Sequence, residues 1–135
     1  MTELTLEMAE QAWRAAQTCA RELRAPMTIT IVDESGRLVL CARGDGTGFF
    51  TPETSRAKAV AAAAFLRSTT ELAELAATGS AFWKTVPVIL DGEALPTPGG
   101  TPIMRAGRMI GAIGCGGGTG EQDQRCADAG AAAVK

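Results

Sequence analysis

The sequence predicts an α+β fold, in which one antiparallel sheet is covered by several helices. Three observations predict it. Segments of alternating side chains occur in pairs joined by tight turns, as antiparallel strands are. Segments with helical periodicity stand before, between and after these pairs, so helices are available to cover the sheet. The length of 135 residues is enough for one core but too short for two ordinary domains, so residues 1–135 are predicted to form a single domain.

The first helix and the first pair of strands are predicted within residues 6–43. Small and apolar side chains recur at three- and four-residue steps over residues 6–23, as on one helix face, and Thr5 is the predicted N-cap. Residues 27–32 and 37–43 alternate in polarity as strands do, with a turn between them. This stretch is therefore predicted to be a helix followed by a hairpin.

Two helices are predicted after the glycine-rich loop 44–48. The first begins near Thr51, where a proline stands at the first helical position, and runs to about Arg67. A capping-box pattern at residues 68–71 then starts a short helix that ends before Gly79.

The last third of the chain is predicted to hold a second pair of strands and a final helix. Proline and glycine interrupt residues 80–100, where only a short strand at 86–90 is expected. Residues 101–105 and 108–114 are predicted strands joined by a tight turn. A second capping box at 119–122 begins the final helix.

The chain contains no histidine, and this excludes several kinds of site. Ser-His-Asp and Cys-His catalytic sets and histidine-containing zinc sites all need an imidazole. Histidine is also the commonest protein ligand to haem iron, and tyrosine is absent as well. Haem or a corrinoid is therefore expected only through Met or Cys, and acid–base chemistry only through Asp, Glu, Lys, Cys or water. No metal site is predicted.

Charge and hydropathy indicate a cytoplasmic protein. A net charge of −2 and a pI near 5.2 give no basic surface for nucleic acid, and no apolar run has the length of a membrane span. The first residues carry an acid where a signal peptide carries Lys or Arg. No C-x-x-C pair is present, so we expect four reduced thiols: Cys19, Cys41, Cys115 and Cys126.

Two glycine-rich segments are candidates for ligand binding. Residues 114–119 join a predicted strand to a capped helix, where backbone N–H groups can bind an anion. The alternative is a tight corner at which neighbouring backbone packs closely. Residues 98–102 either line the same pocket or form the irregular start of an edge strand. The candidate ligand-binding positions in these segments are Gly99, Gly100, Gly116, Gly117, Gly118 and Thr119.

Three basic side chains are candidates for supplying positive charge to a ligand. Arg56 and Lys58 are two residues apart on a predicted helix, so they do not share a face, and one can point to a pocket while the other points to water. Arg43 flanks the first glycine loop. The plainer alternative is that all three are solvated charges.

The candidate catalytic groups are two carboxylates, an amine and a thiol. Glu121 and Asp123 lie in the first turn of the final helix, where acids stabilise the helix dipole, and either is also a candidate general base. Lys58 is a further candidate base. Cys115 stands near a helix N-terminus, which lowers a thiol pKa, although its place in the strand alternation favours simple packing.

Three stretches together resemble the GlcG/HbpS family, which also occurs as the C-terminal domain of PduO-type corrinoid adenosyltransferases. They are the hairpin 29–38, residues 54–69 (TSRAKAVAAAAFLRST), and the glycine-rich segment from Pro98 to Asp123, which is the most specific. The resemblance implies a profilin- or PAS-like sandwich, homo-oligomers from dimers upward, and binding of a small molecule or cofactor, haem or corrinoid in some relatives. The adenosyl-transferring domain is absent, so that activity is not implied.

Two departures from the family separate this chain from its haem-associated relatives. Imidazole ligation of haem is impossible without histidine, and Cys115-Gly116 replaces the apolar-then-serine pair usual in the family. We therefore expect an oligomeric protein that binds a small polar or anionic metabolite at a glycine-rich pocket. The alternative is a cofactor-free enzyme, a tautomerase, isomerase, cyclase or lyase that works by proton transfer.

Overall fold

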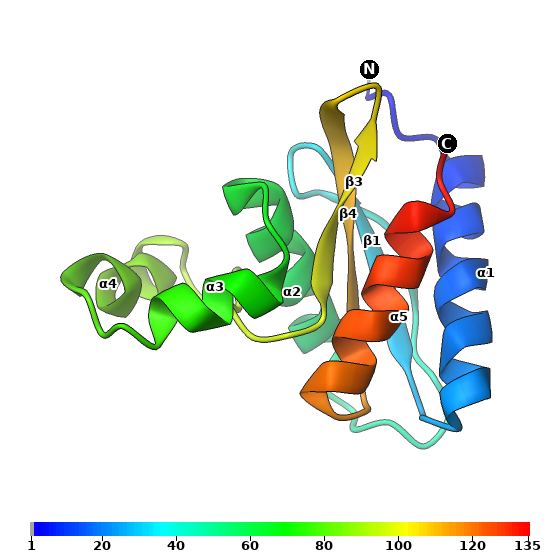
Figure 1. Ribbon diagram of the computed structural model, residues 1–135, viewed down its shortest axis with the longest axis horizontal. Coiled ribbons are helices and arrows are strands. Elements are labelled where there is room, and N and C mark those ends of the chain that lie inside the picture. The colour runs from blue at the N-terminus through cyan, green and yellow to red at the C-terminus, as the bar shows by residue number, and fades with distance from the viewer. Residues whose placement is uncertain (1) are drawn as a thin grey trace.

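The structure, a computed structural model, is an α+β fold built on a four-stranded antiparallel sheet in the order β2-β1-β4-β3 (Figure 1). It describes residues 2–135, and the predicted domain start at Met1 lies outside them. The predicted fold class is confirmed, and each predicted strand that exists is within about two residues of its observed bounds. The strands are β1 (Thr28–Asp33), β2 (Leu38–Ala42), β3 (Gly100–Arg105) and β4 (Arg108–Gly116).

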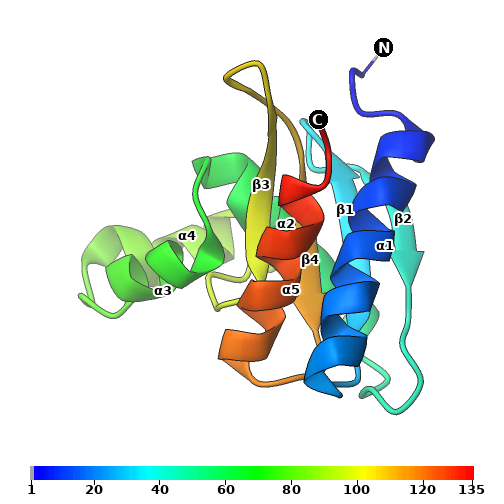
Figure 2. The same ribbon diagram turned by 45° about the vertical axis from the view of Figure 1, so that its right-hand side comes forward.

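Helices cover both faces of the sheet, and two of them project from it. Figures 1 and 2 show α1 and α5 side by side over one face, α2 over the other, and α3 and α4 extending away from the sheet. The helices are α1 (Leu6–Leu23), α2 (Thr51–Phe65), α3 (Thr69–Ala76), α4 (Ala81–Ile89) and α5 (Gly120–Ala132).

The predicted first helix is confirmed residue for residue. The Thr5 side chain accepts from the backbone amide of Met8 at 3.1 Å, and Arg24 ends the helix in the left-handed conformation. Its four fully buried residues are all alanine, which lets the helix lie close to the sheet and to α5. They are Ala9, Ala12, Ala16 and Ala20.

Strand β1 presents a different surface to each layer. Ile29 and Ile31 belong to the apolar core shared with α1 and α5. On the other face the hydroxyl of Thr28 lies 2.8 Å from that of Thr51, and the hydroxyl of Thr30 lies 2.7 Å from that of Ser55. Hydrogen bonds between buried hydroxyls are directional, so they fix where α2 sits along β1.

The expected strand at residues 86–90 is wrong, because these residues belong mostly to α4. Ser80 caps that helix by accepting from the amide of Trp83. Pro87 stands within the helix, yet the amide of Leu90 still donates to the carbonyl of Val86 at 2.9 Å. A proline removes one donor, and near a helix end that loss does not stop the chain from completing its last turn.

We predict that Gly114→Ala destabilises the protein by about 1–3 kcal/mol, the cost typical of overpacking. A Cβ atom on Gly114 would run into the backbone carbonyl of Ser55 in α2, which is not free to move. Gly116→Ala is the matched control on the same strand, because its Cβ would meet its nearest neighbour, the Thr54 hydroxyl, at an ordinary 3.5 Å. Urea unfolding of both variants measures the difference, and equal midpoints would contradict this account of how α2 is seated.

Candidate functional site

A buried ion pair connects the two helical layers. The Lys58 ammonium on α2 lies 3.0 Å from the Asp123 carboxylate on α5 and donates a second hydrogen bond to the carbonyl of Cys115 at 3.0 Å. Both charged side chains are buried. Because α2 and α5 pack on opposite faces of the sheet, the lysine side chain reaches from one layer to the other past the end of β4.

Three of the five predicted ligand-binding glycines, Gly99, Gly100 and Gly116, lie against this lysine, whereas Gly117 packs against Pro26 and Thr47 and Gly118 against Gln122 and Asp123. Gly99 has a φ of 133°, and a Cβ there would lie 2.9 Å from Cδ of Lys58 and 2.5 Å from the carbonyl oxygen of Cys115. At Gly100 a Cβ would lie 2.5 Å from the backbone oxygen of Lys58. The glycines therefore make room for the lysine and its helix, which is the close-packing alternative to ligand binding.

Four of the backbone amides predicted to bind a ligand donate to side chains within the protein. The amide of Gly99 donates to the Gln124 side chain at 2.9 Å, and the amide of Gly118 donates to the Asp123 carboxylate at 2.9 Å. The amide of Thr119 donates to the Gln122 side chain at 3.0 Å. The amide of Gly100 donates to the Thr69 hydroxyl at 2.6 Å. These protons are not free for an anion, so we place the candidate ligand elsewhere.

Burial governs the ionisation of the groups around Lys58. It raises the pKa of Asp123 above its usual value, while the Lys58 ammonium and the Gly118 amide act in the opposite direction. Burial, with smaller contributions from Cys126 and Asp123, raises the pKa of the Cys115 thiol well above its ordinary value. At neutral pH Cys115 is therefore a packed thiol, the alternative that its place in the strand alternation favours, and the direction of its pKa is opposite to the lowering that a helix N-terminus can cause.

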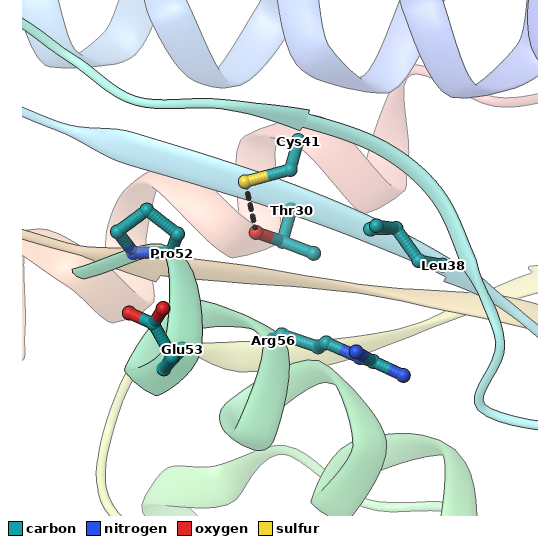
Figure 3. A pocket seen from close by; sticks show the side chains of 6 residues that line it. All are labelled: Thr30, Leu38, Cys41, Pro52, Glu53 and Arg56. Carbon is teal, nitrogen blue, oxygen red and sulfur yellow. Dashed lines mark hydrogen bonds between the residues drawn. The ribbon is translucent and has the colours of Figure 1, made fainter. Parts of the chain in front are cut away.

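A hollow lies between the β1–β2 hairpin and the start of α2, on the face of the sheet that α2 covers (Figure 3). Its volume is about 150 Å³. Figure 3 shows the Thr30 hydroxyl donating to the Cys41 sulfur, at 3.2 Å, at one side of the hollow, with Arg56 extending from α2 toward Leu38. The lining residues are Thr30, Leu38, Cys41, Pro52, Glu53 and Arg56.

Glu53 and Arg56 also line a second hollow of about 170 Å³, together with Ala57 and the loop residues Gly92 and Glu93. The two hollows are thus adjacent, with the Arg56 side chain at the boundary between them. The exposed guanidinium is available to a ligand from either side.

The structure separates the three basic candidates. Arg56 and Lys58 point in different directions from α2, as their spacing predicts: Arg56 lines the hollows, whereas Lys58 is buried against Asp123. Arg43 is exposed after β2 and lines none of the cavities described. Sequence reasoning missed Thr30, Cys41 and Glu53. Thr30 and Cys41 are directly opposite in the β1–β2 pairing, a signal available only after the register is known.

The four catalytic candidates fall into two places. Lys58, Asp123 and Cys115 are buried together and line none of the cavities described. Glu121 is exposed on α5 and lines a separate hollow of about 410 Å³ that also includes Arg125. The structure therefore does not bring Glu121 to the other three.

Within residues 2–135, no three His, Cys, Asp or Glu side chains are grouped so that they could hold a metal ion. No helix in that range combines the length and apolar character needed to cross a bilayer.

Comparison with known proteins extends over nearly the whole chain. Residues 4–132 match the model of a family described as haem degrading protein HbpS-like. GlcG of Escherichia coli is 31% identical over 111 residues, which are 82% of this chain and 79% of GlcG. The crystal structure of a double mutant of Streptomyces reticuli HbpS is similar, with a TM-score of 0.88, 33% identity, and coverage of 100% of this chain and 89% of that one. A PduOC–haem complex has a TM-score of 0.88 and 30% identity, and covers 98% of this chain and 95% of that one.

We predict that Lys58→Met costs about 3–5 kcal/mol of unfolding free energy at neutral pH, because it leaves the Asp123 carboxylate buried without its partner. Arg56→Met is the matched control from the same helix and should change stability by about 0.5 kcal/mol or less, because Arg56 is exposed. Urea unfolding measures both, and equal effects would show that the buried pair does not matter.

The penalty of Lys58→Met should shrink as the pH falls. Since the pKa of Asp123 is raised in the folded protein, the native state takes up this proton before the unfolded chain does. The Asp123 contribution therefore favours folding below the unfolded pKa and is lost as the pH rises through the folded pKa. A neutral carboxyl needs no cation. The difference in unfolding free energy between Lys58→Met and the wild-type protein therefore narrows as the pH falls through the folded pKa of Asp123.

We predict that iodoacetamide labels Cys41 in the native protein and leaves Cys115 and Cys126 unmodified until the protein unfolds. Cys115 is buried with a raised pKa, and burial raises the pKa of Cys126 to about 12, so neither forms the reactive thiolate near neutral pH. Cys41 is partly exposed at the hollow. Peptide mass spectrometry reads the result, and rapid native labelling of Cys115 would restore it as a candidate nucleophile.

Proposed function

Because this chain belongs to the HbpS-like family, we propose that it binds a small organic anion in the two hollows beside Arg56. One observation carries the proposal: Arg56 lines both hollows, and among residues 2–135 no carboxylate lies within ion-pair distance of its guanidinium. A guanidinium binds a carboxylate through two parallel hydrogen bonds, which gives both charge and orientation.

The other lining groups define the ligand more closely. Leu38 and Pro52 offer apolar contact, and the Cys41 thiol is polar, whereas the Thr30 hydroxyl is already engaged with Ser55 and Cys41. Glu53, the acid next to Arg56, would repel a second negative charge and accept a hydrogen bond from a hydroxyl or an ammonium group. These groups favour a small hydroxy or amino acid with a single free carboxylate.

Haem does not fit the residues that are present. The PduOC crystal structure is a complex with haem, but this chain has no histidine that could bind the haem iron. Cys41 stands in a hollow of about 150 Å³, well below the range of about 300–1,000 Å³ typical of larger ligand sites. Met104 is half exposed and lines a different, open hollow beside α5. No described cavity combines a haem-sized apolar slot with an axial ligand, and the same argument applies to a corrinoid.

Binding is favoured over proton-transfer catalysis by the placement of the candidate bases. Lys58 and Asp123 are engaged with each other out of reach of the hollows, and Glu121 lies at another surface. A general base must come within hydrogen-bond distance of the proton it removes, and none of these groups faces the Arg56 hollows.

We predict that lactate, serine or a similar small acid raises the melting temperature of the wild-type protein, by about 8–12 °C at a hundredfold excess over Kd. Arg56→Gln should abolish the shift because it removes the cation. Arg43→Gln is the matched control and should keep the shift, because Arg43 lines neither hollow. Thermal denaturation with and without each acid is the measurement.

Two results would contradict the proposal. One is a panel of small hydroxy and amino acids that produces no shift in the wild-type protein. The other is a shift that survives in Arg56→Gln. Haem is titrated in parallel, and we expect no saturable change in its Soret band at micromolar concentration. A saturable change lost in Cys41→Ala would assign the hollow to haem through a thiolate instead.

A further inference from the structure

Three of the four thiols lie together in the core between the sheet and the helices α1 and α5. Cys115 and Cys126 are fully buried members of that core, and Cys19 packs against it from α1 while staying partly exposed. A free cysteine packs as a small hydrophobe, and its reactivity is what separates it from alanine at such a place. None of the three lines the hollows beside Arg56, so ligand binding there does not use them.

The packing of α1 on α5 places Cys19 at the same level as Cys126. The two helices lie side by side and run antiparallel (Figures 1 and 2). They meet at Gly130, where a Cβ atom would lie 2.8 Å from the Ala12 carbonyl oxygen and 3.3 Å from the Ala16 Cβ atom. Going back along α5 from Gly130 to Cys126 covers about one helical turn. The same rise along antiparallel α1 leads from the contact at Ala12 and Ala16 to Cys19.

Cys19 also stands on the side of α1 that faces α5. It follows Ala12 by seven residues, close to two full turns, so the two side chains point to the same side of the helix. Burial raises the pKa of Cys126 to about 12, and a hydrogen bond between the Cys19 and Cys126 side chains adds to that rise. A disulfide needs Cα atoms within about 7 Å of each other, and alanine and glycine at the crossing let the helices approach closely.

We propose that Cys19 and Cys126 form a modification site, at which a hydroperoxide converts the two thiols into a disulfide that joins α1 to α5. Cys19 reacts first because it is the partly exposed member of the pair. Its sulfur attacks one oxygen of the hydroperoxide, the O–O bond breaks, and the Cys19 proton leaves with the water or alcohol that is released.

The second step joins the two sulfurs. The Cys126 sulfur attacks the sulfenic acid on Cys19, the S–S bond forms, and the hydroxyl group leaves as water with the Cys126 proton. The two sulfurs together lose two electrons, which the peroxide has gained. The bond closes most of the chain into one loop, and closing a long loop restricts the unfolded chain strongly. Oxidation therefore stabilises the domain, and a thiol reductant reverses the effect.

Peptide mass spectrometry of the full chain after treatment with hydrogen peroxide tests the proposal. Trypsin places the four cysteines on separate peptides, with Cys19 on residues 15–21 and Cys126 on residues 126–135. We expect these two peptides to be joined, the intact chain to be two hydrogen atoms lighter, and dithiothreitol to separate the peptides. Cys41→Ala is the matched control, since Cys41 is the other partly exposed thiol, and should form the same bond.

Variants of the pair test the order of the two steps. In Cys126→Ala the reaction should stop at the sulfenic acid on Cys19, which dimedone labels. The oxidised wild-type protein should melt at least about 5 °C above the reduced protein. Cys19→Ala should show no such rise on treatment with peroxide.

Three results would overturn the proposal. One is a wild-type protein whose thiols all stay reduced in peroxide. Another is oxidation of Cys19 to the sulfinic acid with no joined peptide. The third is a disulfide that includes Cys115 or that connects two chains. Because neither Cys19 nor Cys126 lines the Arg56 hollows, each of these results leaves the proposed ligand binding untouched.

Discussion

The passage of Lys58 from one helical layer to the other is the constraint on which this structure depends. The ammonium reaches Asp123 only if no side chain fills the space before β3, where a Cβ atom on Gly99 would lie 2.9 Å from Cδ of Lys58. This ion pair costs the burial of two charges. The cost is tolerable only because the Asp123 carboxylate also accepts a hydrogen bond from the Gly118 amide. The seat of α2, the start of α5 and the glycine-rich corner between them are parts of one arrangement.

The position of Lys58 decides between the two interpretations of the glycine-rich segments. Glycine at a strand-to-helix corner is compatible with anion binding or with tight packing, and here the space is taken by the stem of Lys58 and by backbone. Arg56, two residues earlier on the same helix, is left for ligands. One helical turn of α2 thus supplies both the internal charge that connects the layers and the external charge proposed to bind a ligand.

Much of the fold could be predicted because its signals are local. Thr5, Ser68 and Thr119 cap their helices as their sequence patterns indicate. Residues 86–90 differ from the expected strand because Pro87, which argues against a helix in the sequence, stands close enough to the end of α4 to be tolerated there. The site was less predictable because its contacts are distant in sequence. Lys58 and Asp123 are 65 residues apart, and no spacing rule shows that they pair or that Thr30 and Cys41 share a hollow with Arg56.

The sheet order leaves β2 and β3 at the edges, and an open edge invites another strand to continue the sheet. Strand β3 discourages this in two ways. Pro102 cannot donate a backbone hydrogen bond, and the pairing register shifts between Ile103 and Met104. Copies of this chain are thereby steered away from open-ended strand addition, which is the route to fibres.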